Sequence, residues 1–217
     1  MKRMRAMGCC LVVVFAVGAA TAASASALPE FTGPFPKPFT STSKASIFET
    51  VGGNKTKCTA DTNTGAITGP QSGEIQIVFT GCKLGTVPCN TVGAAPGTIV
   101  TSLLSMRIGY ISKAKKIVGA DLVEPTSGGF TSYGCGPVIF VKVQGSVIGR
   151  LLPINKVVIP SAVFKLIFTQ TLGIQKYPNL EASPIDILES SFGGPFEVTG
   201  LASTDAILFG EPVKLIA

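Results

Sequence analysis

Apolar and polar residues alternate in several short runs of this chain. Within Glu74–Thr80, every second position is isoleucine or phenylalanine and most of the intervening positions are polar. A period of two is typical of a β-strand with one buried face. The same alternation occurs over 104–110 and 162–168, whereas 138–143 is apolar on both faces for most of its length, as expected of an interior strand.

Further runs of β-branched and aromatic residues are separated by Gly, Pro, Asn and Asp, which favours short antiparallel connections. These strand candidates are 46–51, 55–59, 98–102, 117–123, 146–151, 206–209 and 213–216. The pattern predicts an all-β fold with about a dozen short strands and little or no helix. An antiparallel β-sandwich or a barrel-like sheet would bury their apolar faces.

One segment carries a helix-start signal. Ser183–Asp186 has an N-cap residue, a proline at the first helical position and an acid at the third. Because two glycines follow at 193 and 194, either a single turn or a strand over 187–192 fits the segment.

The amino terminus has the organisation of an export signal. Three basic residues precede an uncharged apolar run, Leu11–Ala20, and the small residues of Ala23–Ala27 follow. This order predicts a secretory signal peptide over residues 1–27, cleaved after Ala27. The apolar run is shorter than the roughly 20 residues that a membrane-spanning helix needs. We therefore expect a secreted or envelope-associated chain without a membrane span.

Two regions follow the signal. Residues 28–43 are rich in Pro, Ser and Thr and show no apolar period, which predicts an extended arm. Residues 44–217 carry the strand pattern and are predicted to form a single all-β domain.

Composition excludes several classes of chemistry. The 217 residues include 46% hydrophobic and 14% charged residues, a balance that argues against intrinsic disorder. Histidine is absent, which excludes Ser-His-Asp and Cys-His catalysis and imidazole metal ligands. Removing the three basic residues of the signal halves the formal net charge of +6. The cluster Lys113–Lys116 is expected in a solvated hairpin turn, so no basic face predicts a nucleic-acid partner.

Four cysteines remain after the signal: Cys58, Cys82, Cys89 and Cys135. An even number in an exported chain predicts two structural disulfides. Gly and Pro between Cys82 and Cys89 favour a chain reversal there, which would pair these two and leave Cys58 for Cys135. The two other connectivities stay open. The cysteines contain no Cys-x-x-Cys pair, which argues against zinc.

Candidate metal and nucleophile motifs are incomplete. Asp61 and Asn63 occupy the first and third positions of a calcium-loop pattern, but glycine stands at the fifth position and serine at the twelfth. An Asx turn between two strands explains this segment, and we expect no metal or cofactor. Ser-x-x-Lys occurs at 41–44 and 112–115 without the other motifs of a serine nucleophile, so both segments are interpreted as loops.

Carboxylates are the remaining candidates for acid/base chemistry. Asp121 with Glu124, and Asp186 with Glu189, would suit glycoside hydrolysis if both members of a pair faced one cleft. No sequence feature around them indicates a raised pKa.

A set of longer strings also carries a resemblance. The segments are 49–53 (ETVGG), 64–70 (TGAITGP), 79–82 (FTGC), 93–95 (GAA), 99–101 (IVT), 109–111 (GYI), 118–119 (VG) and 145–149 (GSVIG), together with the single residues Cys89 and Gly97. From about residue 44 onward the chain resembles uncharacterised exported proteins of high-GC soil actinobacteria. The resemblance implies a bacterial source and secretion, and it supplies no activity or functional residues.

The sequence therefore favours a non-enzymatic secreted or envelope-associated domain with a binding or structural role. Gly-, Thr-, Ser- and Asn-rich loops at 83–96 and 124–136 are the predicted contact surface, with a cell-envelope or extracellular polymer as the expected partner. The alternative is an extracellular carboxylate-dependent, glycosidase-like hydrolase.

Overall fold

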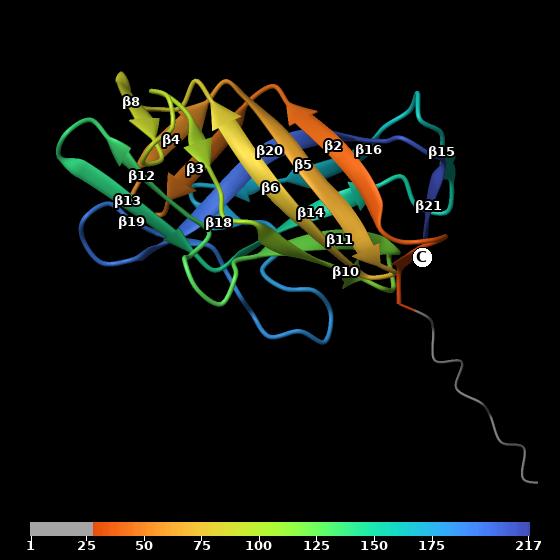
Figure 1. The fold of residues 1–217 in the computed structure, drawn as a ribbon. Coiled ribbons are helices and arrows are strands. Elements are labelled where there is room, and N and C mark those ends of the chain that lie inside the picture. Colours follow the sequence, from red (N-terminus) through yellow and green to blue (C-terminus); the bar gives the residue numbers. More distant parts are fainter. Residues whose placement is uncertain (1–27) are drawn as a thin grey trace, which may run out of the picture.

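The computed structural model describes residues 28–217, and the regular structure of these residues consists of β-strands (Figure 1). Every strand pair is antiparallel. The predicted all-β, antiparallel and barrel-like architecture is thus confirmed. The predicted signal peptide, residues 1–27, lies outside the described residues.

Eight strands close into an antiparallel barrel. Their order around the barrel is β16 (Phe164–Phe168), β14 (Ser146–Leu152), β11 (Ile117–Val123), β10 (Leu104–Ser112), β6 (Ser72–Thr80), β5 (Ala60–Gly69), β2 (Lys37–Ser43) and β20 (Glu197–Phe209). The pairing of β16 with β20 closes the barrel. Alternate residues of these strands point inward, and on β6, β10 and β16 they are apolar, as in Ile75, Leu104 and Phe164.

A second ring of strands shares β20 with this barrel. Its other members are β3 (Ser46–Thr50), β4 (Lys55–Cys58), β7 (Lys83–Leu84), β8 (Val87–Asn90), β12 (Thr131–Cys135), β13 (Ile139–Gln144) and β19 (Glu189–Ser191). The first half of β20 pairs with β19 and β3, and the second half pairs with β16 and β2. The long strand β20 therefore connects the two rings (Figure 1).

Shorter strands complete the fold. A three-stranded sheet joins β1 (Glu30–Phe31), β21 (Val213–Ile216) and β15 (Val157–Val158); β9 (Ile99–Val100) pairs with β6, and β17 (Gln170–Thr171) forms a hairpin with β18 (Ile174–Gln175). Phe31 of the small sheet packs edge-on against Phe164, with ring centroids 5.7 Å apart. This contact fixes the small sheet on one end of the barrel.

Both disulfides lie in the second ring, and their connectivity differs from the favoured one. Cys58 bonds to Cys82, and Cys89 bonds to Cys135, with Cα atoms 3.9 and 4.1 Å apart. The chain does reverse between Cys82 and Cys89, because the N–H of Cys89 donates to the carbonyl of Cys82. Strand pairing nevertheless places Cys89 of β8 directly opposite Cys135 of β12, and Cys82, between β6 and β7, bonds to Cys58 of β4. The prediction of two disulfides is confirmed, and the favoured pairing is wrong.

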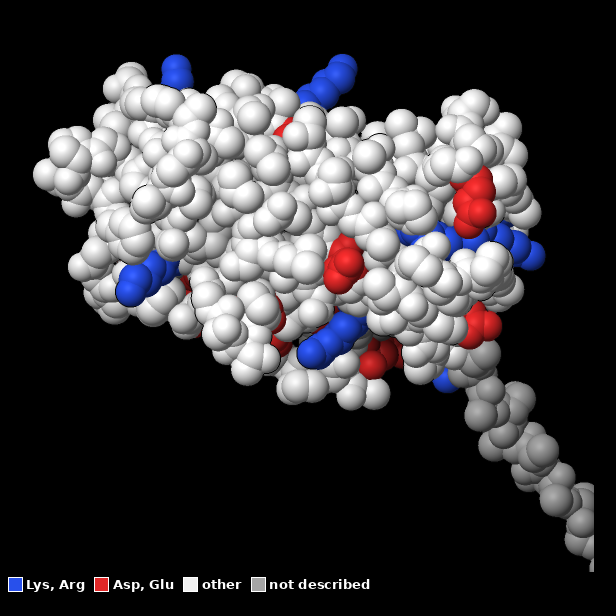
Figure 2. All heavy atoms as spheres, in the orientation of Figure 1, with Lys and Arg blue, Asp and Glu red and all other residues white. Residues whose placement is uncertain are grey.

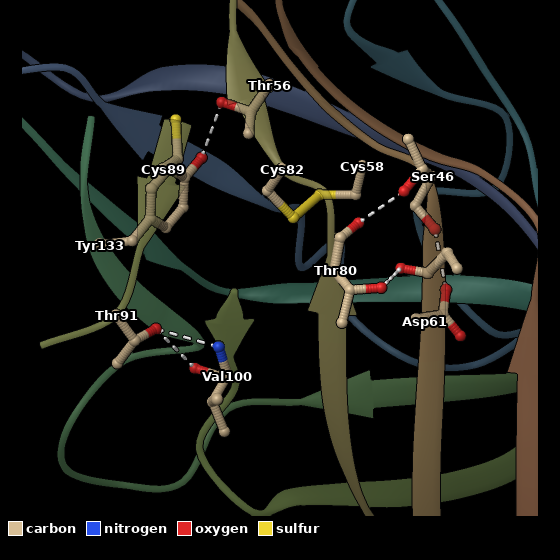
Figure 3. Close-up of a disulfide and its surroundings, with 12 residues drawn as sticks. Ser46, Thr56, Cys58, Asp61, Thr80, Cys82, Cys89, Thr91, Val100 and Tyr133 are labelled. Carbon is tan, nitrogen blue, oxygen red and sulfur yellow. Dashed lines mark hydrogen bonds between the residues drawn. A yellow bond between two sulfur atoms is a disulfide. The ribbon is translucent and has the colours of Figure 1, made fainter. Parts of the chain in front are cut away.

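A buried tyrosine of the second ring lies beside these disulfides. The Tyr133 side chain is fully buried, and its hydroxyl lies 3.1 Å from Oγ1 of Thr56 (Figure 3). Burial raises the pKa of Tyr133 to about 12, so the phenol stays protonated.

Residues 28–43 are not the predicted free arm. They include β1 and the barrel strand β2, which lies between β5 and β20. The inward face of β2 is polar at three of its four positions, Lys37, Ser41 and Ser43. Because both faces of β2 are therefore mostly polar, this strand shows no hydrophobic alternation.

Candidate functional site

The strands β2 and β3 follow each other along β20, and a β-bulge lies between them where the two rings meet. Both strands pair with the same edge of β20, Thr42 opposite Ala206 and Ile47 opposite Ala202. Between these pairs, four residues of the β2–β3 line face three residues of β20. One extra residue reverses the face to which the following side chains point, because side chains alternate along a strand.

As a consequence, two serines within the bulge reach the same carboxylate. The hydroxyls of Ser43 and Ser46 both donate to Oδ2 of Asp61, the second over 2.9 Å. Figure 3 shows Ser46 next to Asp61. Oγ of Ser46 also lies 3.2 Å from Oγ of Ser203 on β20. In a regular strand, positions three residues apart point to opposite faces. The bulge is therefore what brings both hydroxyls to Asp61.

A second carboxyl group, Asp205 of β20, meets Asp61 inside the barrel. Nδ2 of Asn63 lies 2.9 Å from Oδ1 of Asp61, 3.0 Å from Oδ1 of Asp205 and 2.8 Å from Oγ of Ser41. Asp61 and Asp205 are only 1% and 5% exposed. The three adjacent strands β5, β2 and β20 thus enclose a polar cluster in which two acids share one amide group.

The pKa of Asp205 is raised to about 8, first by burial and then by the negative charge of Asp61 and a hydrogen bond between the two carboxyl groups. Hydrogen bonds from Ser203 and Asn63 act in the opposite direction. Neither acid forms a salt bridge with a Lys or Arg among residues 28–217. Below about pH 8, Asp205 therefore keeps a proton that it donates to Asp61.

An open groove of about 650 Å³ lies over this cluster. Ser43 and Ser203 line it, and their hydroxyls donate to the buried acids, Ser203 to Oδ2 of Asp205 over 3.3 Å. The bulge, β3, β16 and β20 supply the mostly apolar walls, which include Ala45, Ile47, Phe168, Ala202 and Ala206. Lys44 is the only charged residue among those that line the groove. The groove is thus a mostly apolar surface whose lining also includes Thr42, Ser43, Ser203 and Thr204.

The acids that the sequence singled out lie elsewhere. Asp121 of β11 is affected by the charge of Asp186, whereas Glu124 follows the end of β11 and does not shift the pKa of Asp121. The pKa of Asp121 is raised to about 6, chiefly by burial; the neighbouring Ser146 hydroxyl lowers it, the charge of Asp186 raises it, and the charge of Arg107 lowers it.

Asp121 lies on the outer face of the barrel beneath the segment 176–188. Oγ of Ser146 donates to the backbone oxygen of Asp186 over 2.9 Å, and the N–H of Glu181 donates to the carbonyl of Tyr110 over 2.7 Å. Asp121 is 8% exposed. Asp121 therefore forms part of the surface against which the segment 176–188 packs. Glu189, predicted to pair with Asp186, instead accepts a hydrogen bond from Gln144.

Two motif interpretations are corrected by the structure. Asp61–Gly65 is part of strand β5, and the predicted Asx turn is wrong. Ser41–Lys44 runs from the barrel interior to the rim of the groove, where Lys44 is exposed. The second Ser-x-x-Lys segment, 112–115, forms the end of β10 and the following turn, and the segment 183–186 forms no helix.

The predicted contact loops 83–96 and 124–136 lie side by side through the pairing of β8 with β12, and neither lines the groove. Within residues 28–217, no group of three or more His, Cys, Asp or Glu side chains is arranged to hold a metal ion. In the same part of the chain, no helix has the length and apolar character needed to cross a membrane.

No signal in the hydrophobic pattern marks the polar cluster. Asp61 and Asn63 match only an incomplete calcium-loop pattern, and Ser46, Ser203 and Asp205 belong to no motif. Comparison with known proteins finds no matching family model, no similar curated protein and no similar solved structure.

Proposed function

We propose that this chain is an exported, non-enzymatic binding protein whose ligand occupies the groove over the β2–β3 bulge. The observation that carries the proposal is the groove itself, about 650 Å³ with mostly apolar walls and four Ser and Thr residues in its lining. Ligand sites commonly combine an apolar concave surface with a few fixed polar groups.

The buried network supports binding rather than acid/base chemistry. Ser43 and Ser203 donate hydrogen bonds to the carboxyl groups of Asp61 and Asp205, and both acids have almost no exposure. A ligand in the groove meets hydroxyl oxygens held at fixed positions. Such a preformed surface reduces the ordering cost of binding.

Export is part of the same proposal. The amino-terminal pattern of residues 1–27 and the resemblance to exported actinobacterial proteins favour secretion or association with the cell envelope. The two disulfides weakly suggest an oxidising, extracellular environment.

A neutral apolar dye tests the groove. Residues 28–217 are titrated with N-phenyl-1-naphthylamine, and saturable binding is expected. Ala206→Phe would fill the groove and is expected to weaken binding by about tenfold or more. Thr64→Phe, on the exposed face of β5 away from the groove, is the matched control and should bind as the parent does. Absence of saturable binding, or an unchanged Ala206→Phe, would contradict the proposal.

One observation favours the alternative of a carboxylate-dependent hydrolase. The paired carboxyl groups of Asp61 and Asp205 share a proton below the groove, and proton-sharing acid pairs occur in hydrolases. Incubation of the protein with extracellular polysaccharides tests it. Hydrolysis that disappears in Asp205→Asn, while the variant keeps its fold by circular dichroism, would replace the binding proposal.

A further inference from the structure

A row of cross-strand neighbours leads from the groove to a pair of lysines. Ala202 of β20 lies opposite Ile47 of β3, Ile47 opposite Lys57 of β4, and Lys57 opposite Lys83 of β7. Residues that pair directly across antiparallel strands point to the same face of the sheet. The first two members line the groove, and the two lysines are exposed beyond it. Apolar groove and basic surface are therefore continuous.

The two lysines lack acidic partners. Like charges directly opposite each other in a sheet are destabilising. Among residues 28–217, neither Lys57 nor Lys83 forms a salt bridge. Lys55 is neutralised by Glu49, whose Oε1 lies 2.8 Å from its Nζ. Hydrogen bonds from Lys55 and then Gln170 lower the pKa of Glu49, and Lys57 makes only a smaller, long-range contribution.

A hollow accompanies the lysines. It measures about 370 Å³ and is lined by Lys55, Lys57, Leu84 and the turns at 53–54 and 85. Lys57 thus borders this hollow, while its strand neighbour Ile47 borders the groove. Elsewhere charged side chains are sparse, and Figure 2 shows wide areas without them over β2, β5 and β6. The opposed lysines are therefore a distinct positive feature next to an apolar groove.

Resting on the function proposed above, we infer that the ligand is an amphiphilic anion. Its apolar part lies in the groove against Ile47 and Ala202, and its oxyanion, a carboxylate, sulfonate or phosphate, is bound by Lys57 and Lys83. Neighbouring strands are about 4.8 Å apart, so the lysines start about 5 and 10 Å beyond Ile47. A ligand whose apolar part and oxyanion are separated by a similar distance can therefore contact both the apolar walls and the ammonium groups. Lys44 at the rim of the groove adds to the same positive field.

Two related dyes test this assignment. 1-Anilinonaphthalene-8-sulfonate carries the same rings as N-phenyl-1-naphthylamine and adds one sulfonate. The full 28–217 chain is titrated with both dyes at low and at physiological salt. The sulfonate dye is expected to bind about tenfold more tightly than the neutral dye at low salt, and this advantage should shrink as salt is added.

The double variant Lys57→Gln, Lys83→Gln is expected to weaken sulfonate binding by about fivefold or more and to leave neutral dye binding unchanged. Lys115→Gln, Lys116→Gln removes the same charge from the exposed β10–β11 turn and should change neither dye. Both pairs are exposed, so the variants should fold.

The outcomes separate the two proposals. Neutral dye binding that Ala206→Phe abolishes, together with sulfonate binding unaffected by Lys57→Gln, Lys83→Gln, would overturn the amphiphilic anion and retain the groove. Equal losses in the two lysine pairs would also overturn it, because they would reflect net charge alone. Failure of both dyes to bind saturably would overturn the groove proposal as well.

Discussion

The proton shared by Asp205 and Asp61 makes the stability of this chain depend on pH in a specific range. The folded chain holds the proton of Asp205 up to about pH 8, whereas an unfolded aspartate has a pKa of 3.8. Between these values the folded state binds more protons than the unfolded state. The free energy of unfolding must therefore fall as pH rises through this interval, and it levels off above pH 8.

The range from pH 6 to pH 8 isolates this group. The sequence has no histidine, so no imidazole titrates there. The other acid with a raised pKa, Asp121, titrates at about 6 and acts mainly below this range. Each pH unit over which one proton is retained only by the folded state changes stability by about 1.4 kcal/mol. We expect a loss of about 2 to 3 kcal/mol between pH 6 and pH 8.

Guanidinium unfolding at half-unit pH steps, followed by circular dichroism with the disulfides intact, measures this loss. Asp205→Asn keeps the size of the side chain and cannot ionise, so its stability should be nearly constant from pH 6 to pH 8. Asp121→Asn is the matched control, because it should remove only the contribution of Asp121 between pH 4 and pH 6 and keep the slope above pH 6. A parent chain equally stable at pH 6 and pH 8, or a slope that survives in Asp205→Asn, would refute the shared proton.

Two further predictions concern a tightly packed glycine and a buried hydrogen bond. A β-carbon added at Gly65 would lie 2.4 Å from a backbone oxygen and 2.5 Å from Cζ of Phe39, so Gly65→Ala should destabilise by about 1 to 3 kcal/mol. Gly210→Ala meets no atom within 4 Å and serves as its control; equal effects on the denaturation midpoint would contradict the packing argument. Tyr133→Phe removes the hydroxyl partner of Thr56 in a dry interior and should cost about 1 to 2 kcal/mol, whereas an unchanged midpoint would mean that this hydrogen bond contributes nothing.

Strands with an apolar inner face were predictable from the sequence. The segments 117–123 and 213–216 match β11 and β21, and 74–80 lies within β6. Their apolar inward residues give the period of two directly. The connectivity of the disulfides was not predictable, because it depends on which distant strands become neighbours across a sheet.

The strands that build the site were the ones that the pattern missed. β2, β5 and the middle of β20 place Ser41, Asp61, Asn63, Ser203 and Asp205 on their inward faces. Both faces of β2 and β5 are therefore mostly polar, and the inward positions of β20 are polar at Ser203 and Asp205, so hydrophobic alternation vanishes where the cluster lies. This missing alternation is why the sequence predicts an arm over residues 28–43 and a turn at Asp61–Gly65, where the structure has strands.

The bulge and the polar cluster depend on each other. A strand with polar residues on both faces has a weakly specified register, because slipping by one residue exposes no apolar face. Here Ser43 and Ser46 can reach Asp61 together only when the extra residue lies between Thr42 and Ile47. The hydrogen bonds of the cluster thus fix the strand register here, as the packing of apolar side chains does in a barrel with an apolar core. The same extra residue separates β2 from β3 along β20 and opens the groove. A polar interior, which costs stability in a barrel, thereby determines the shape of the groove on its surface.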